Sequence, residues 1–242
     1  MIADGLIKQC RVCGSSKTVR AHLFPRSLSH DIRGEAKHVV AFRPSLPGPK
    51  FHQSGEWSDR ILCREHEDVA HRWEDYAITF CRRFGEAVQD IGRPLSVDVA
   101  NPDPKSLILF AHVITWRHAA AWPHLENELG PYFQRIQDVV FAGADPLDVM
   151  VVDPGHVRGG ERALLGLCPS KIVMGDRRGY RFDIGGLSFI VKTDKRPYQW
   201  PLGGELLADQ NPLRVLLQDP IELHHNPQLM SAVKRVRLAS ER

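Results

Sequence analysis

Two evenly spaced pairs of metal-ligand residues constrain this chain more than any other feature. Cys10 and Cys13 are separated by two residues, and so are Cys63 and His66. That spacing lets a tight turn, or the first turn of a helix, direct both side chains at one ion. Gly14 follows the first pair and suits a turn that needs a positive φ. The pattern predicts a tetrahedral zinc site with these two pairs as ligands. The alternative is ordinary buried thiols and a surface histidine.

A histidine motif lies between the two pairs. It reads Ala21-His22-Leu23-Phe24-Pro25, and an apolar dipeptide precedes Cys63. This order of CxxCG, histidine with two apolar residues and proline, and CxxH resembles the HNH (His-Me finger, ββα-metal) nucleases. The resemblance covers about the first quarter to third of the chain; the remainder vaguely resembles phage- and prophage-type proteins with such a front end. It implies a zinc-bound treble-clef module of two strands and a helix, and a metal-dependent endonuclease that hydrolyses DNA.

The resemblance also implies roles for three residues. His22 would be the general base that takes a proton from water attacking a phosphodiester, a task that suits a neutral imidazole. A divalent cation, Mg²⁺ or Mn²⁺, would stabilise the charge on the phosphate. The family's final histidine is replaced here by Glu67, which is a competent ligand for a hard cation. The family's middle asparagine is also missing, and Ser58 and Asp59 stand in its neighbourhood. Asp59 would orient His22 or bind the cation.

Other interpretations of the same residues remain open. The two departures also fit a nuclease-derived zinc module that binds nucleic acid or a protein partner without catalysis. A zinc-stabilised interaction protein with no nucleic acid is a third interpretation. His22 could simply pack against the zinc module, Glu67 could be a carboxylate favoured by a helix N-terminus, and Asp59 could be a turn residue. His71 lies one turn after Glu67 and could share its helix face.

The charge of the chain is compatible with a nucleic-acid partner. The formal net charge is +3 and the isoelectric point is about 8.6, which permits DNA binding without proving it. Arg20 and Arg26 flank His22, and Arg64 follows Cys63. We therefore expect these three arginines to contact phosphates. DNA is the predicted partner, a protein is the alternative, and the sequence does not indicate an oligomeric state.

The cysteine count and the apolar segments favour a cytoplasmic protein. Five cysteines, three of them in the two metal-ligand pairs, do not suggest a disulfide scaffold, and Cys81 and Cys168 are predicted to be buried and reduced. The first ten residues lack the charged-then-apolar layout of a signal peptide. The most apolar run, 107–122, contains Arg117 and two histidines, so it predicts a core helix and no membrane partner.

The hydrophobic patterns predict an α+β fold. Apolar side chains recur at helical spacing over 66–91, 105–121 and 124–141, with Gly130 and Pro131 as a kink in the last segment. Short strands are predicted at 148–152, 171–174, 180–184 and 187–191, the last two joined by a Gly185-Gly186 hairpin. A breaker at 101–104 divides the chain into a zinc module with a long helix, 1–97, and a part of unknown role, 98–242. That second part is predicted to hold helices and a small antiparallel sheet.

Overall fold

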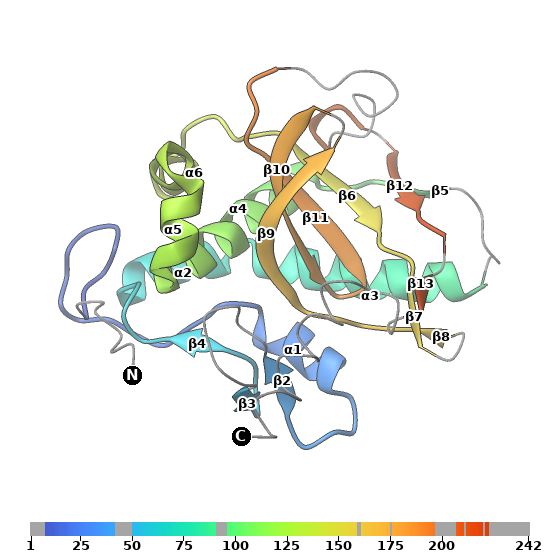
Figure 1. Ribbon diagram of the computed structural model, residues 1–242, viewed down its shortest axis with the longest axis horizontal. Helices are drawn as coiled ribbons and strands as arrows, with labels where there is room; N and C mark the ends of the chain where they lie inside the picture. The colour runs from blue at the N-terminus through green and yellow to red at the C-terminus, as the bar shows by residue number, and fades with distance from the viewer. Residues whose placement is uncertain are drawn as a thin grey trace.

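The computed structural model shows a mixed α+β protein (Figure 1). It describes residues 8–41, 50–90, 96–158, 161–174, 176–196, 207–210, 212–219 and 221–222. Within these ranges no helix has the length and apolar character needed to cross a lipid bilayer. The predicted α+β class is confirmed, but the sheet is larger than the sequence indicated.

Six α-helices lie in the described ranges: α1 Arg26–Arg33, α2 Arg64–His71, α3 Glu74–Asp90, α4 Pro104–Ala121, α5 Pro123–Leu129 and α6 Pro131–Ala142. A short 3-10 helix, η2, spans Leu207–Asp209. Helix α4 matches the predicted range. It begins where Asp103 accepts hydrogen bonds from the backbone N–H of Ser106 at 3.1 Å and from its hydroxyl at 2.6 Å.

Two of the predicted helices are each divided in the structure. The segment predicted as one helix over 66–91 forms α2 and α3, with Arg72 and Trp73 in a turn between them. Trp73 packs against both large hydrophobic clusters, so the division lets α2 and α3 follow different neighbours. The segment 124–141 forms α5 and α6 because Gly130 adopts a φ of 54° that a helix interior does not allow.

In the part of the chain that the structure describes, the main sheet has six strands in the order β5-β12-β6-β11-β10-β9. They are β5 Ser96–Val99, β6 Val149–Asp153, β9 Leu167–Met174, β10 Arg177–Ile184, β11 Leu187–Lys192 and β12 Leu213–Leu217. The predicted hairpin is confirmed, with Ile184 opposite Leu187 and positive φ at both glycines of the turn. The small antiparallel sheet predicted from the sequence is incomplete, because β5 and β12 extend it and β12 runs parallel to β6.

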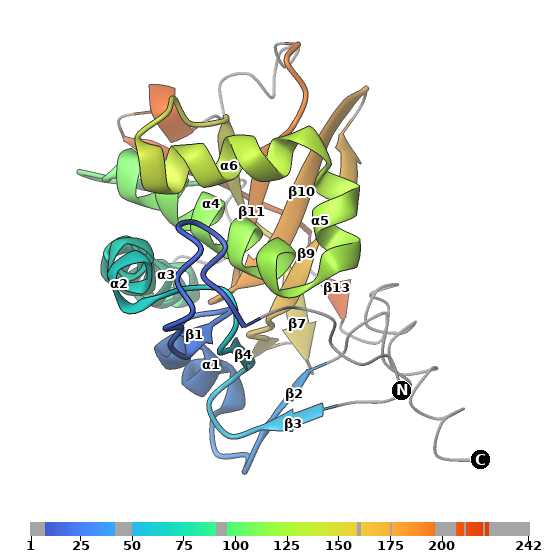
Figure 2. The same cartoon turned by 90° about the vertical axis from the view of Figure 1, so that its left-hand side faces the viewer.

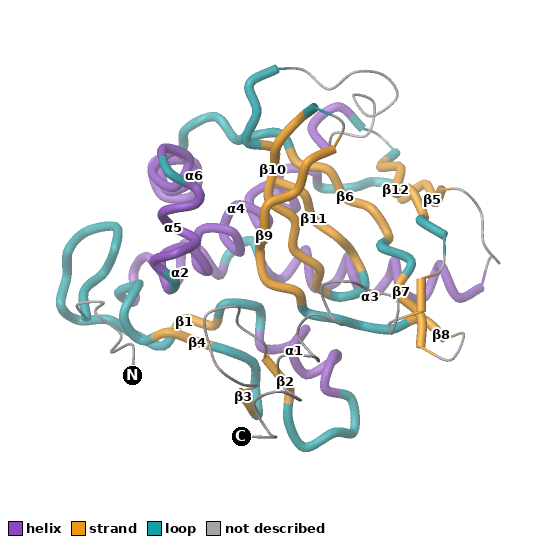
Figure 3. The backbone as a smooth tube through the Cα atoms, viewed as in Figure 1, coloured by secondary structure: helices purple, strands orange, loops and turns teal. Residues whose placement is uncertain are grey.

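Among the described residues, three smaller sheets lie outside the main one. Strands β1 Ala21–His22 and β4 Trp57–Ser58 form an antiparallel pair, shown side by side near α2 in Figure 3. Strands β2 Val39–Ala41 and β3 Lys50–His52 form a second antiparallel pair. Strands β7 His156–Arg158, β8 Glu161–Arg162 and β13 Ile221–Glu222 form the third sheet.

Helix α4 is buried on all sides, and this positions the candidate site. One side of α4 and helix α3 pack against the main sheet through a cluster that includes Phe84, Phe110 and Phe182. A second cluster joins α4 to α5, α6 and residues around β1 and α2. Figure 2 shows α5 and α6 on one side of the molecule, with β1, β4 and α1 below them. Because both sides of α4 are covered, Arg117 is 0% exposed.

Candidate metal centre and the adjoining polar site

The first ligand pair lies on a tight turn that the rest of the module holds in place. Gly14 has a φ of 76°, and its N–H donates to the carbonyl of Cys10 at 2.9 Å. The N–H of Arg11 donates to the carbonyl of Ile61, also at 2.9 Å. This bond ties the turn to the segment that leads into α2. The positive φ predicted for Gly14 is confirmed.

The second ligand pair lies at the start of α2. Cys63 is the residue that precedes the helix, with an extended backbone, and its carbonyl accepts the N–H of Glu67 at 2.9 Å. His66 lies in the first turn of the helix, so its ring faces the same way as the thiol of Cys63. The ring of His66 also packs edge-on against Phe141 of α6, at a centroid distance of 5.5 Å.

The four side chains meet at a point that fits a tetrahedral metal ion. Their ligand atoms all lie within 4.8 Å of one another. Sγ of Cys13 is 3.8 Å from Sγ of Cys63, and Sγ of Cys10 is 3.8 Å from Nδ1 of His66. Zn–S bonds of about 2.3 Å in a tetrahedron place two sulfurs about 3.8 Å apart. The predicted ligand set therefore forms a Cys₃His cluster that could hold a metal ion such as zinc.

Backbone groups favour a thiolate at this cluster. Burial raises the pKa of the Cys10 thiol, but N–H groups of Cys13, Cys63 and Val12 directed at its sulfur lower it on balance. Burial raises the pKa of Cys63, and so do the neighbouring thiols of Cys10 and Cys13. A cation bound among the three sulfurs would offset both costs, because thiolates are the form that ligates metal.

His22 lies on β1, opposite Trp57 of β4. Directly opposed residues of an antiparallel pair share a face of the sheet, so the two rings lie on the same side. The imidazole is half-buried, and within the described residues its Nε2 is buried with no hydrogen-bond partner. Burial lowers the pKa of His22, and the charges of Arg117, Arg26 and Arg20 lower it further, against an opposing effect of Glu74. The imidazole is therefore neutral at pH 7.

A buried network of charges lies beside His22. Arg117 of α4 donates from Nη1 to the backbone carbonyl of His22 at 3.1 Å, and Nη1 also contacts the Glu74 carboxylate of α3. Its Nη2 faces Glu67 of α2 at 3.1 Å as an ion pair without hydrogen-bond geometry. Nδ1 of His71 lies 2.9 Å from the second oxygen of Glu74. One guanidinium thus joins the strand of His22 to two carboxylates from two helices.

The two carboxylates titrate differently although they share one arginine. Burial raises the pKa of Glu67 to about 7, opposed by Arg117 and supported by the neighbouring charge of Glu74. Burial also raises the pKa of Glu74, but Arg117 and His71 outweigh it, so the pKa of Glu74 is lowered. The bond to Glu74 raises the pKa of His71. Glu74 is therefore the firmly ionised partner of Arg117.

Of the other predicted site residues, some lie near His22 and some do not. Arg20 and Arg26 are exposed and close enough to His22 to lower its pKa, and the guanidinium of Arg20 lies 4.2 Å from the centre of the Trp57 ring. Arg64 is exposed and pairs with a neighbouring carboxylate of its own helix. The carboxylate of Asp59 pairs with Lys8 at 3.0 Å, and no described contact joins it to His22.

Sequence reasoning did not assign Arg117, Glu74 or Trp57 to the site. Arg117 carried a signal, because it is a charged residue in an otherwise apolar helix, and such a charge needs a partner when buried. No such sequence signal marked Glu74 or Trp57. Glu74 lies in a continuous helical pattern, and Trp57 lies in a short segment without clear periodicity.

The described chain thus defines one class of protein, a mixed α+β protein with a Cys₃His cluster that could bind a metal ion near its N-terminus. Comparison with protein-family models, with curated proteins and with solved structures finds no match for it. Its function must therefore be inferred from the site itself.

Proposed function

We propose that this protein hydrolyses phosphodiester bonds in DNA as an HNH-like endonuclease, with a structural zinc ion in the Cys₃His cluster. The observation that carries the proposal is the buried, unpartnered Nε2 of His22 among the described residues, on an imidazole whose pKa is lowered by burial and then by the surrounding arginines. A neutral imidazole with a free nitrogen is suited to general-base catalysis. The tight turn at Cys10–Gly14, then β1, β4 and α2, follow one another around the cluster. This order agrees with a treble-clef, ββα arrangement.

In the proposed reaction His22 takes a proton from a water molecule. The water oxygen forms a bond to phosphorus, the bond from phosphorus to one ester oxygen breaks, and that oxygen leaves with a proton from solvent. Negative charge gathers on the phosphate oxygens in the transition state, and arginine side chains are suited to stabilise it. Arg20 and Arg26 lie near His22 and can contribute such charge. Zinc would hold the turn, the strands and α2 in register.

DNA is the substrate that the surface around His22 fits best. Trp57 is 38% exposed on the same face, with Arg20 against its ring. An exposed aromatic ring beside an arginine offers stacking to a base and an ion pair to a phosphate. The reaction as proposed does not use the second cation that the family resemblance predicts, Mg²⁺ or Mn²⁺ near Glu67.

Plasmid nicking tests the proposal directly. We expect the zinc-loaded protein to convert supercoiled plasmid to open circles, and His22→Ala to lower the rate at least about 100-fold, the usual contribution of a general base. His124→Ala is the matched control, because His124 is exposed on α5 and is not one of the four cluster residues. Unchanged zinc content would show that His22→Ala still folds. Equal rates for wild type and His22→Ala would refute the role of His22.

A second candidate function is binding of DNA without catalysis. The observation that favours it is the ion pair of Glu67 with Arg117, which engages the carboxylate that a catalytic cation would need. In that case the protein retards DNA in a gel without nicking it, and retention falls as salt rises. Arg20→Ala with Arg26→Ala should weaken retention, whereas Arg178→Ala, which removes an exposed arginine of β10 with no described contact to His22, should not. Absence of both nicking and retention would point to a protein partner.

A further inference from the structure

The guanidinium of Arg117 contacts both the Glu67 and the Glu74 carboxylates, next to His22. It reaches this place from α4, and Arg117 is 95 residues further along the chain than His22. Its side chain is 0% exposed, and the carboxylate side chains of Glu67 and Glu74 are 14% and 5% exposed. An arginine stays protonated at every pH that a protein tolerates. The site therefore contains a permanent positive charge. Because this charge belongs to a buried side chain, an ion from solvent cannot readily replace it.

A divalent cation cannot use the same carboxylates while the guanidinium is there. Mg²⁺ and Mn²⁺ need oxygen ligands at about 2.0–2.2 Å, in near-octahedral geometry. Arg117 instead lies 3.1 Å from Glu67, contacts Glu74 directly and donates to the carbonyl of His22. An ion inserted between these oxygens would also meet the guanidinium charge at close range, where repulsion in a buried site is strong.

We propose that Arg117 is a built-in cation at this site and that the site takes no divalent ion. The guanidinium holds Glu67, Glu74 and the strand of His22 in place, as a bound metal otherwise would. Arg117 is in this view a positioning residue. Its meaning for catalysis rests on the function proposed above, because it implies that cleavage would proceed without added Mg²⁺ or Mn²⁺.

The unsatisfied groups of this cluster distinguish it from a purely structural ion pair. Within the described residues, Nε of Arg117 is buried without a hydrogen-bond partner, and so is Nε2 of His22. A second buried cluster, on strands β10 and β11 of the main sheet, is different. There Asp183 accepts two bonds from Arg181 and one from Ser188. The spare N–H of Arg117 beside His22 is the kind of donor that an anionic ligand would use.

Manganese binding tests the proposal without reference to activity. The protein is first loaded with one equivalent of zinc, which fills the cysteine cluster, and is then titrated with Mn²⁺ while the electron paramagnetic resonance signal of free Mn²⁺ is followed. We expect wild type to leave that signal unchanged. If wild type binds one Mn²⁺ and Glu67→Gln abolishes the binding, the proposal is overturned.

Removing the guanidinium should uncover a metal site. Arg117→Met has a side chain of similar length without charge, and it leaves two carboxylates and His71 facing one cavity. We expect it to bind one Mn²⁺ at least tenfold more tightly than wild type, and Arg117→Met with Glu67→Gln to lose that binding. Arg117→Lys keeps a positive charge and should bind no Mn²⁺. A folded Arg117→Met that binds no Mn²⁺ would contradict the proposal. If it does not fold, the wild-type titration still decides.

Nicking assays in buffer freed of divalent ions by a chelating resin separate the two proposals. Cleavage by the zinc-loaded protein without added Mg²⁺ supports both. Cleavage that needs added Mg²⁺ or Mn²⁺ overturns the built-in cation and leaves the endonuclease standing. No cleavage in any buffer, together with no Mn²⁺ bound, refutes the endonuclease and leaves the built-in cation standing.

Discussion

The metal module and the main sheet are stabilised by different means. The module around β1, β4 and α2 has strands of two residues each, and its turn is fixed by a few backbone hydrogen bonds. The main sheet has strands of up to eight residues, with one register shift between β9 and β10 at Arg181 and Asp183, and stacked phenylalanines fill its core. So few short elements cannot bury enough apolar surface to fold alone, and a metal ion is the usual substitute.

The polar site lies where these two regions meet. His22 and Glu67 come from the module, whereas Arg117 comes from the helix that packs against the sheet. The polar groups of this site are thus placed by the cysteine cluster's module on one side and by the apolar core on the other. A site built this way should fail when either region fails, but by different routes, and the predictions below separate those routes.

Removing the metal should have the largest effect. We expect a chelator, or Cys63→Ser, to release zinc and make residues 8–25 and 56–71 sensitive to protease while α3 and the sheet stay protected. Binding free energies in small zinc domains are about 10 kcal/mol or more, so the module cannot remain folded without the ion. Metal analysis and limited proteolysis with mass spectrometry measure both outcomes.

Cys168→Ser is the control for this experiment, because Cys168 lies on β9 outside the cluster. It should keep the metal and the protease pattern of wild type. A Cys63→Ser protein with native protease resistance throughout would show that the ion does not stabilise the module. The two regions would then not differ in the way proposed.

Truncating the core of the sheet should have the next largest effect. Phe189 is 0% exposed, and its ring stacks on Phe182 at 5.2 Å and meets Phe110 at 5.3 Å. We expect Phe189→Ala to lower the free energy of unfolding by about 3–5 kcal/mol, because it removes contacts and leaves a cavity. Urea denaturation measures this loss.

The metal affinity of Phe189→Ala should equal that of wild type, because Phe189 contacts the sheet and not the module. Competition with a chromophoric zinc chelator gives that affinity. A tenfold weaker affinity would mean that the two regions are one cooperative unit.

The sequence predicted what depends on local spacing. The Cys₃His cluster was found because its ligands come in two pairs with two residues between members, and the β10–β11 hairpin because two glycines suit its turn. It could not predict pairings between distant segments. Strand β12 joins β5 through residues 116 apart in the chain, as Asp98 and Arg214 show.

The same distinction applies to the site. His22 and Glu67 were identified from motif positions, but the arginine that links them comes from another helix, and no local pattern indicates which carboxylate a buried arginine meets. Asp59 was chosen because it stands near a motif position, and in the structure its carboxylate pairs with Lys8. Proximity in sequence gave no information about side-chain direction there.

A smaller effect is expected from acid, and it originates in the helix between the two regions. His112 of α4 lies 2.7 Å from the carbonyl of Ile108 through Nδ1 and accepts the N–H of Leu147 at Nε2. Burial lowers its pKa from 6.5 to about 4. Because the folded state binds the proton less well than the unfolded state, stability is lost as pH falls from about 6.5 to 4, by about 3 kcal/mol at most.

His112→Gln tests this directly, because glutamine can keep one donor and one acceptor but does not titrate. We expect urea denaturation between pH 6.5 and 4 to show a flatter pH dependence for His112→Gln than for wild type. Metal release at low pH affects both proteins alike, so the difference between them isolates His112. Parallel curves would refute the assignment.

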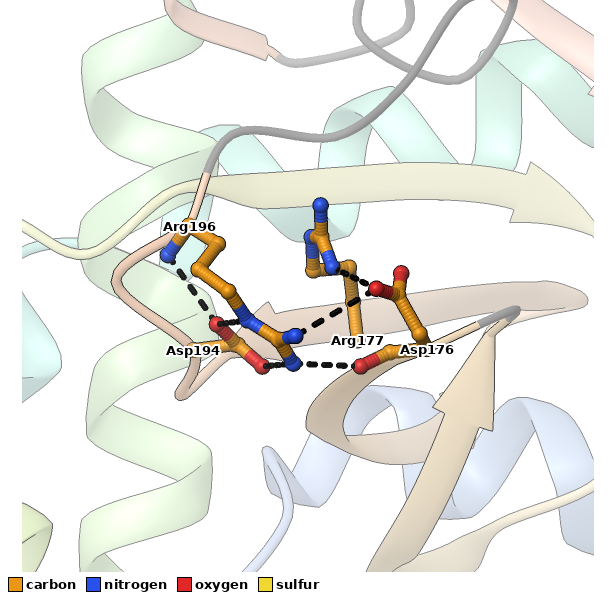
Figure 4. A network of polar contacts seen from close by, with 4 residues as sticks. All are labelled: Asp176, Arg177, Asp194 and Arg196. Carbon is orange, nitrogen blue, oxygen red and sulfur yellow. Dashed lines mark hydrogen bonds and ion pairs between the residues drawn. The ribbon is translucent and has the colours of Figure 1, made fainter.

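The smallest effect should come from a surface network that resembles the buried one in composition. Arg196 donates to Asp194 at 2.9 and 2.6 Å and to the backbone carbonyl of Asp176 at 2.6 Å (Figure 4). Like Arg117 it contacts two acidic residues, but Arg196 is 56% exposed and Arg117 is 0% exposed. Exposed pairs lie in solvent of high dielectric constant and contribute little, whereas breaking a buried pair leaves an unpaired charge at a cost of about 3–5 kcal/mol.

We expect Arg196→Ala to leave the melting temperature by calorimetry unchanged and Arg117→Ala to lower it by many degrees. Equal shifts in melting temperature would mean that burial does not make the Arg117 network more important for stability than the Arg196 network.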